Sequence, residues 1–491
     1  MPIFFVVDHP KDWPIAIPGV EVVTAREYLT RPENLPKRGV KVFNLCRSYR
    51  YQSVGYYVSL LAAARDHRPL PSVATSQDFR SPSLVRVMSE DLVELIAKSL
   101  SGIVSDEFVL SIYFGRNLAK KYRRVSRELF NLFPAPLLRA WFLRDKDGWE
   151  LRRLRPIGVK DIPDGHREFV IEAAKTFFER RVSTSRRRAP ARFDLAILVN
   201  PAEEEPPSNK QALARFVKAA QEVGFRPEFI ESDDYGRLTE FDALFIRETT
   251  SVNHHTYRFS RRAAAEGLVA IDDPDSILRS TNKVFLAEAL KQAGVPVPKT
   301  RIVHRDNIDE VAAELGSPAI LKLPDSSFSM GVVRCNDIDE FRQRAAKYLE
   351  QSDLLIAQEF LPTEFDWRVG VFDGRALYVC RYFMAKSHWQ IIQRDTNGKF
   401  LRGGKVEVMR AEDAPERVID IALRSTRPIG DGLYGVDLKE VNGRCHVIEV
   451  NDNPSIDGGF EDRVIGLDLY RRIMNVFLER VERLKAGGSR K

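Results

Sequence analysis

Three oxygen-bearing side chains near the C-terminal end of the chain could hold a metal ion. In HVIEVNDNPSIDGG, residues 446–459, Glu449 and Asn451 are two residues apart, so both project from one face if the segment is a strand. Asp437 lies on the preceding strand of the same predicted hairpin. Carboxylate and amide oxygens suit Mg²⁺, which binds one or two carboxylates together with substrate phosphates. We therefore expect these three residues to hold Mg²⁺, with Mn²⁺ as an alternative ion.

The loop of this hairpin decides whether the three side chains share a face. A two-residue turn at 442–443 would turn Asp437 away from Glu449, whereas a three-residue loop at 441–443 would bring both to one face. We therefore predict the three-residue loop, with Gly443 in the left-handed conformation that such a loop requires. A bulge elsewhere in the ladder would give the same result. The alternative is that both carboxylates are exposed and pair with arginines.

A magnesium ion at this position needs a phosphate partner, and two lysines are candidates to bind it. Lys322 lies in an apolar predicted strand, where an ammonium group loses hydration unless it meets an anion. Lys283 lies at the start of a predicted helix over residues 281–294, with Thr281 as its expected N-cap. The segment DSSFSMG, residues 325–331, adds hydroxyl and backbone N–H groups that could cover a phosphate chain.

The elements that must position these residues change type along the chain. Its 491 residues suggest about three domains. We predict an N-terminal α/β domain over residues 1–185, followed by a linker in VSTSRRRAPAR, residues 182–192. Residues 193–280 alternate strands and helices, which favours a small α/β domain with a mostly parallel sheet. Residues 281–485 mix hairpins and helices, so the predicted fold class is α/β and α+β in several domains.

Composition restricts the class of protein. A hydrophobic fraction of 44% and a charged fraction of 30% are typical of soluble proteins. The chain starts without a basic leader and offers no window of about 18 uncharged apolar residues, so we expect no signal peptide and no membrane span. Four cysteines without CxxC spacing argue against a disulfide framework or a structural zinc site, and favour a reducing cytoplasm.

Residues 116–155 are strongly basic. They contain twelve Lys or Arg residues against four acidic ones, a local excess of +8, whereas the whole chain carries +7. Such a stretch could meet nucleic acid or an acidic peptide. The interpretation that we favour is a solvated helix face.

The order and spacing of motifs in residues 281–460 resemble those of the ATP-grasp ligases, and most closely the RimK-like branch, which joins amino acids to a carboxylate end. The matching stretches are NK at 282–283, GVPVPKT at 294–300, AILK at 319–322, QEFL at 358–361, DWRV at 366–369, RGG at 402–404, GVD at 435–437 and IEVNDNPS at 448–455. Residues 193–280 are similar to the pre-ATP-grasp domain of that family. Residues 1–185 look like the N-terminal domain found ahead of some RimK-like ATP-grasp proteins, a likeness carried by residues 43–71. The resemblance implies an ATP-grasp fold, in which two α+β lobes clasp ATP.

The resemblance also implies roles for residues in these motifs. The implied nucleotide contacts are phosphate binding by Lys283 and Lys322, an adenine-reading hinge at Glu359 and Phe360, and a ribose contact at Asp366. Asp437, Glu449 and Asn451 would hold Mg²⁺. Arg402, ahead of two glycines, would stabilise the transferring phosphate or the acyl-phosphate.

Two departures from the family pattern concern the phosphates and the acceptor. The phosphate-covering loop is usually glycine-rich, whereas SSFSMG at 326–331 has one glycine and three serines. The Arg-Ser-Asn triplet that precedes RGG in the RimK pattern is Asn-Gly-Lys here, at 397–399. Lys386 and Arg394 are candidates for the missing cation.

The implied reaction is the ATP-dependent ligation of a carboxylate to an amine. A substrate carboxylate attacks the γ-phosphate of ATP to give an acyl-phosphate and ADP, and an amine then displaces phosphate from the acyl carbon. The protein mainly positions the reactants and neutralises charge. We expect a glutamate-like amino acid and a carboxylate acceptor on a peptide, a protein or a small molecule. A nucleic-acid-binding or ribosome-binding protein with a regulatory ATP-grasp region is the alternative, and assembly into a homo-oligomer stays open.

Two further groups have roles that the sequence leaves open. Arg247, at the end of a predicted strand, is either a bidentate fork for the acceptor carboxylate or a surface arginine. His254 and His255 start a predicted helix near 254–266. Because side chains one residue apart do not share a helix face, we do not expect a two-histidine metal site there.

Overall fold

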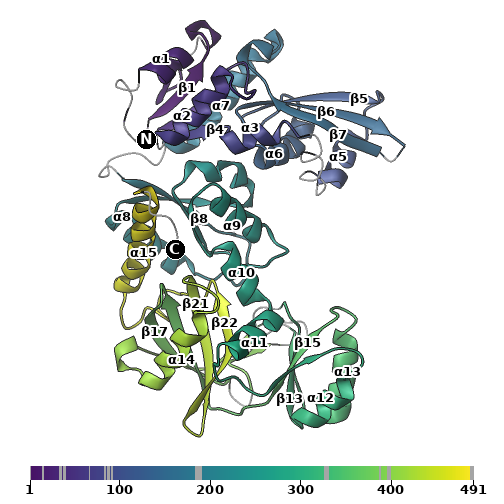
Figure 1. The fold of residues 1–491 in the computed structure, drawn as a ribbon, viewed down its shortest axis with the longest axis vertical. Coiled ribbons are helices and arrows are strands. Elements are labelled where there is room, and N and C mark those ends of the chain that lie inside the picture. The colour runs from purple at the N-terminus through teal and green to yellow at the C-terminus, as the bar shows by residue number, and fades with distance from the viewer. Residues whose placement is uncertain are drawn as a thin grey trace. The chain divides into compact units, whose positions relative to one another are not determined.

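The computed structural model describes most of the chain. The described residues are 2–13, 16–31, 36, 40–65, 67–81, 85, 89, 92–146, 148–182, 191–325, 331–385, 389–394 and 400–486. They form two compact units, shown in Figure 1: the first comprises Met1–Phe193 with Asp233–Phe241, and the second comprises Asp194–Ser232 with Asp242–Lys491. No helix among these residues is both long enough and apolar enough to cross a membrane.

The first unit contains two sheets that share one core. Its parallel sheet has the order β2-β1-β3-β4, formed by β1 (Ile3–Val7), β2 (Val20–Thr24), β3 (Lys41–Asn44) and β4 (Arg68–Leu70). Its antiparallel sheet is formed by β5 (Glu107–Tyr113), β6 (Leu137–Asp145) and β7 (Gly148–Pro156). The helices are α1 (Ala25–Thr30), α2 (Val54–Ala64), α3 (Val73–Asp78), α5 (Val93–Leu100), α6 (Arg123–Leu132) and α7 (Arg167–Val182). Phe5 and Phe43 of one sheet and Phe142 of the other belong to the same buried cluster, which holds the sheets together.

The basic stretch of residues 116–155 makes several of its contacts inside this unit. Arg116 pairs with Glu172 at 3.3 Å, and Arg144 pairs with Asp106 at 3.1 Å. Ion pairs of this kind are typical of a solvated, salt-bridged surface.

The second unit begins with an α/β layer. Its sheet has the order β11-β10-β8-β9, formed by β8 (Phe193–Leu198), β9 (Phe225–Ile230), β10 (Ala243–Ile246) and β11 (Val269–Ile271). The strands β8, β10 and β11 run parallel, and α8 (Lys210–Glu222) lies between β8 and β9 in the chain, whereas α9 (His255–Ala265) lies between β10 and β11. The C-terminal helix α15 (Leu467–Lys485) lies beside α8 (Figure 1), where the rings of Phe216 and Tyr470 are 4.6 Å apart.

Two antiparallel sheets complete the second unit. The four-stranded sheet, in the order β12-β15-β13-β14, is formed by β12 (Thr300–Val303), β13 (Ala319–Lys322), β14 (Val332–Cys335) and β15 (Leu355–Glu359), with α12 (Ile308–Leu315) and α13 (Ile338–Tyr348). The five-stranded sheet, in the order β20-β17-β16-β21-β22, is formed by β16 (Phe365–Phe372), β17 (Arg375–Phe383), β20 (Val406–Met409), β21 (Leu433–Val441) and β22 (Arg444–Asp452). The helices α10 (Pro274–Thr281), α11 (Lys283–Gln292) and α14 (Glu416–Thr426) and the short strands β18 (Ile392–Arg394) and β19 (Phe400–Gly403) accompany this sheet.

The five-stranded sheet has one apolar face and one polar face. Trp367 and Val369 of β16 and Val436 and Leu438 of β21 are buried in a common core with residues of α11 and α14. Because side chains alternate along a strand, the residues between them point to the opposite face. The expected N-cap of α11 is wrong by one residue: Asn282, not Thr281, accepts the N–H groups at the start of the helix. This cap places Lys283 in the first turn.

Candidate active site

The β21–β22 hairpin closes with a two-residue turn, so the predicted three-residue loop is wrong. Asn442 and Gly443 have φ angles of 51° and 74°, and Val441 pairs with Arg444. Positive φ at both central positions is what a type I′ turn requires, and the twist of this turn matches that of the flanking strands. The Asn-Gly pair therefore favours the shorter loop.

A β-bulge further along the ladder brings the carboxylates to one face. Leu438 pairs with Val447, but the next residue, Asp437, pairs with Glu449. Ile448 is the extra residue that this register shift accommodates. Asp437 and Glu449 consequently lie opposite each other on the polar face. The sequence predicted this shared face through a three-residue loop, whereas a bulge elsewhere in the ladder produces it.

Asp437 is at the centre of a polar network. Arg368 on β16 donates from Nε and Nη2 to the two oxygens of Asp437, at 2.6 and 2.7 Å, which is a bidentate pair. Asn451 donates from Nδ2 to Asp437 at 3.3 Å. Burial lowers the pKa of Arg368, but Asp437 outweighs this effect and raises the pKa well above its usual value. The sequence analysis assigned no role to Arg368, although strand alternation from Asp366 places it on the polar face.

Two buried lysines face Glu449. The Nζ atom of Lys283 is 3.2 Å from Oε1 of Glu449, and Lys283 and Lys322 are each 7% exposed. Burial raises the pKa of Glu449, but the two lysines more than offset this effect, so the pKa lies below its usual value. Burial lowers the pKa of Lys322 to about 8, although Glu449 opposes that shift. Lys322 is therefore an ammonium group that a further anion would stabilise.

Asp366 is also on the polar face. It accepts hydrogen bonds from Lys439 Nζ at 2.6 Å and from Thr363 Oγ1 at 3.0 Å. Burial raises the pKa of its carboxyl, although Lys439 acts in the opposite direction. The side chain is therefore fixed by protein partners, and its contact with a ribose stays a prediction.

A mostly apolar pocket lies beside the two lysines. Its walls come from α11, both antiparallel sheets and the Ile448 bulge. The residues lining it are Lys283, Leu286, Ala287, Leu290, Val297, Thr300, Lys322, Ile356, Gln358, Val447 and Ile448. Apolar walls with a few polar groups are typical of sites for small ligands.

The predicted hinge follows this pocket along β15. Glu359 is the last residue of β15, and its N–H donates to the carbonyl of Lys299 at 3.0 Å. Phe360 follows directly, with the guanidinium of Arg334 4.5 Å from the centre of its ring. The reading of adenine by Glu359 and Phe360 stays a prediction.

Arg247 is not the surface arginine that was one of the two alternatives left open by the sequence. It is 1% exposed, so it is not a surface arginine. It donates to Ser208 at 3.0 Å, to Asn453 at 2.7 Å and to the carbonyl of Pro454 at 2.9 Å, and it also contacts the carbonyl of Pro207. These contacts fasten the segment after β22, and the binding of an acceptor carboxylate by Arg247 stays a prediction.

Several predicted residues cannot be placed to the same extent. Arg402 lies on β19, opposite Gln393 of β18, but its side chain is outside the described residues. The described residues also leave out the side chain of Arg394, most of the loop at 325–331, Lys386 and residues 397–399. The roles suggested for these residues stay predictions.

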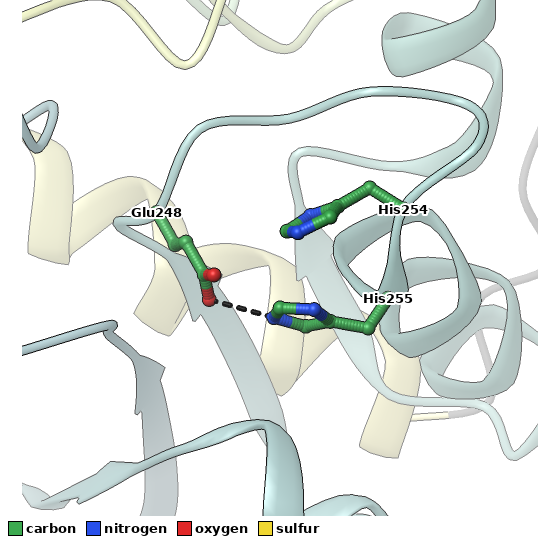
Figure 2. A group of neighbouring side chains, drawn as sticks. All are labelled: Glu248, His254 and His255. Carbon is green, nitrogen blue, oxygen red and sulfur yellow. Dashed lines mark hydrogen bonds and ion pairs between the residues drawn. The ribbon is translucent and has the colours of Figure 1, made fainter. Parts of the chain in front are cut away.

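The sequence analysis missed one convergence of side chains, shown in Figure 2. His254 is not helical: it is the N-cap of α9, with φ −136° and ψ 161°, and the helix begins at His255. The two rings therefore lie 3.9 Å apart, centre to centre, and both point towards Glu248. The argument from helix faces was wrong because only one of the two histidines is in the helix.

Two parts of the chain match described families. Residues 25–173 match the RimK-like ATP-grasp N-terminal domain, and residues 280–477 match the RimK-like ATP-grasp domain. Together the two matches cover more than half of the chain.

Curated relatives and solved structures are similar to the C-terminal part. A probable alpha-L-glutamate ligase from Thioalkalivibrio sulfidiphilus is 27% identical over 244 residues, which is 49% of this chain and 77% of the relative. A protein of the same description from Enterobacter is 27% identical over 240 residues, 48% of this chain and 77% of the relative. A D-alanine–D-alanine ligase from Bacillus anthracis covers 60% of this chain and 99% of its own, with a TM-score of 0.47 and 16% identity. A RimK domain ATP-grasp protein from Sphaerobacter thermophilus covers 57% and 98%, with a TM-score of 0.44 and 16% identity.

Proposed function

We propose, from the premise that this chain belongs to the RimK-like ATP-grasp family and is an ATP-dependent ligase, that it joins glutamate or a similar amino acid to a carboxylate acceptor. The curated relatives are described as probable alpha-L-glutamate ligases, which supports glutamate as the amine substrate. The acceptor would be a peptide, a protein or a small molecule that ends in a carboxylate.

One observation carries the proposal. The bulge at Ile448 gathers Asp437, Glu449 and Asn451 on one face of the sheet, where Lys283 of α11 contacts Glu449 beside an apolar pocket. Acidic oxygens and cations beside an apolar pocket suit the binding of a nucleotide and its phosphates.

The donor set fits the Mg²⁺ that the family uses. Two carboxylates and an amide offer hard oxygen ligands within one ladder register, and Mg²⁺ prefers such ligands. Asp437, Glu449 and Asn451 would hold the ion, which, when bound, neutralises charge on the phosphates of ATP. The cations that now pair with the carboxylates, Arg368 and Lys283, are then available to phosphate oxygens.

The residues of the chain would act mainly by positioning and by neutralising charge. Lys283, Lys322 and Arg368 would hold the triphosphate in line with the attacking substrate carboxylate. The attack transfers the γ-phosphoryl group to the carboxylate and releases ADP. The amine of glutamate then attacks the acyl carbon, loses a proton to solvent and displaces phosphate. No covalent intermediate with a protein side chain is needed.

The experiment measures ADP release and new amide masses together. The full chain is incubated with Mg·ATP, glutamate and a pool of short peptides and small carboxylic acids. We expect ADP only when both an amine and a carboxylate acceptor are present, and an acceptor heavier by one glutamyl residue. Release of ADP without a new amide, whichever substrates are added, would contradict the proposal.

A matched pair of variants ties the reaction to the site. Glu449→Gln should abolish ADP release because it removes one of two charged oxygen ligands. Glu412→Gln makes the same change at an exposed position and should leave the rate unchanged. Thermal melting of both variants shows whether the fold is intact.

A further inference from the structure

Glu248, His254 and His255 form a second cluster of side chains that the ligase reaction does not use. One ligand atom from each residue lies within 4.8 Å of the other two. Glu248 follows β10, and the two histidines stand at the start of α9 (Figure 2). Nε2 of His255 is 2.8 Å from Oε2 of Glu248.

The surroundings hold these side chains in place. Asn200 donates to the other oxygen of Glu248 at 3.2 Å, and Asn453 donates to the backbone carbonyl of Glu248 at 2.6 Å. The Nδ1 atom of His254 is 3.1 Å from the hydroxyl of Thr256, which leaves Nε2 as the nitrogen that can face Glu248. Outer contacts of this kind orient the ligands at metal sites.

The charge balance of the cluster favours a cation. Glu248 is only 2% exposed, and a buried carboxylate is stabilised by a positive partner. Glu203, which accepts from the N–H of Thr249 at 3.2 Å, adds a second carboxylate nearby.

The types of donor select the kind of cation. Imidazole nitrogen suits Zn²⁺ and similar first-row transition ions, whereas Mg²⁺ prefers oxygen ligands. Two histidines and one carboxylate are also a known ligand set for Zn²⁺ with an open fourth position. An ion would lie between Nε2 of His255 and Glu248, and the neutral imidazole of His255 would then carry its proton on Nδ1.

We propose that Glu248, His254 and His255 form a binding site for a divalent transition-metal ion such as Zn²⁺, with one coordination position left for water or a ligand. The site is additional to the oxygen set on β21 and β22. It does not depend on which substrates the ligase uses.

The test is a metal titration of the full chain in which the oxygen site is disabled. In the Glu449→Gln background, metal-free protein is titrated with Zn²⁺, and separately with Co²⁺, whose visible absorption reports nitrogen ligands and coordination number. We expect one ion per chain and an intense four-coordinate Co²⁺ band. Bound Zn²⁺ should also raise the melting temperature, because it binds the folded state.

Variants assign the ligands. Adding His255→Ala or Glu248→Gln to that background should weaken Zn²⁺ binding at least tenfold and abolish the Co²⁺ band. His304→Ala is the matched control, because His304 is exposed and pairs only with Asp306 among the contacts described, at 3.8 Å; it should leave binding unchanged. If Glu248→Gln fails to fold, His254→Ala, at a partly exposed position, takes its place.

Two results would overturn the proposal. One is a parent protein that shows no stoichiometric ion and no shift in melting temperature at saturating Zn²⁺. The other is unchanged Zn²⁺ affinity in folded His254→Ala and His255→Ala variants, which would place the bound ion elsewhere.

Discussion

The polar face of β16, β21 and β22 and the cluster at the start of α9 both gather carboxylates, yet their neighbours differ. On the sheet, Asp437 faces Arg368 and Glu449 faces Lys283. In the cluster, Glu248 faces two imidazoles. The lysine and arginine beside Asp437 and Glu449 support our proposal of phosphates and a hard ion on the sheet, whereas the imidazoles beside Glu248 support our proposal of a borderline ion. The partners of an acidic residue therefore say more about its ligand than the residue itself does.

The two regions also differ in how the backbone brings the side chains together. On the sheet, a register shift at Ile448 places residues from two strands opposite each other. In the cluster, a change from extended to helical backbone between His254 and His255 turns two adjacent side chains towards one point. Arg247 connects the regions, since it binds Asn453, whose amide in turn holds the carbonyl of Glu248.

The largest effect is expected at Asp437. Asp437→Asn should lower the rate of ADP formation about 100-fold or more, since a positioned charge at the transferring phosphate is lost. It should also destabilise the fold, because Arg368, whose side chain is only 21% exposed, keeps its charge without its partner. Steady-state kinetics and urea unfolding measure the two effects.

A double variant separates those two consequences. Adding Arg368→Met to Asp437→Asn removes the unpaired charge, so stability should recover while the rate stays low. Recovery of the rate together with stability would mean that Asp437 acts only through folding.

Lys322 gives the next largest effect. Lys322→Met should raise the KM for ATP at least tenfold, as expected when a charge-assisted hydrogen bond of about 1.5–3 kcal/mol is lost. The same change should raise the melting temperature at pH 7, because burial has lowered the pKa of this ammonium to about 8 and its charged form is unfavourable in the fold. An unchanged KM would remove Lys322 from the nucleotide site.

The pKa of Lys322 also predicts a pH dependence with a definite sign. Below about pH 8 the side chain is charged and attracts phosphate; above that value it is neutral. The affinity of the free protein for ATP should therefore fall as the pH rises through about 8. Lys322→Arg should flatten this profile, because a guanidinium stays protonated over the whole range. Equilibrium binding of a non-hydrolysable ATP analogue between pH 7 and 9 checks it.

Arg247 tests whether the two regions are coupled. Arg247→Ala should lower the free energy of unfolding by about 3 kcal/mol, since buried acceptors in Pro207, Asn453 and Pro454 lose their donor. Both ADP formation and Zn²⁺ binding should weaken. Arg301→Ala, which removes an exposed arginine beside Glu314, is the control and should change neither. If only one of the two activities responds to Arg247→Ala, Arg247 does not connect the regions.

The smallest effect is expected at the hairpin turn. Gly443→Ala introduces a Cβ at a φ of +74° and should cost about 1 kcal/mol of stability. The rate of ADP formation should stay unchanged, because the bulge, and not the turn, sets the register at the carboxylates. Gly165→Ala, at a position without positive φ and with open space around it, is the control for stability. A large loss of rate in Gly443→Ala would show that the turn sets the register after all.

Local patterns in the sequence predicted the pairing of strands and the shared face of Asp437 and Glu449 better than they predicted the loop. The alternation of residue types along β21 and β22 required one irregularity, but it did not say where in the ladder it falls. Because the Asn-Gly pair stabilises a two-residue turn, the irregularity is not in the loop. It is the bulge at Ile448. Arg368 is two residues after Asp366, so the alternation of side chains along the strand predicts that it lies on the polar face. This prediction was overlooked.

Other features depend on contacts that are distant in sequence or on a boundary of one residue. The burial of Arg247 follows from Pro207 and Pro454, which are far apart in the chain and leave no periodic pattern. The histidine cluster depends on whether the helix begins at 254 or 255, and sequence patterns locate helix ends only to within a few residues. One residue of difference decided whether two imidazoles diverge or converge.

The extra residue at 448 also bears on how relatives of this chain should be compared. Val447 and Val450 are both in the core. They are three residues apart because the bulge at Ile448 adds one residue between them. A relative that lacks this one residue but keeps every acidic residue would turn its second carboxylate towards the apolar core. Under the role that we propose for Glu449, such a chain would align well and fold and yet lack one ligand for the ion. The number of residues between Val447 and Val450 is therefore the feature to compare in relatives, together with the glutamate.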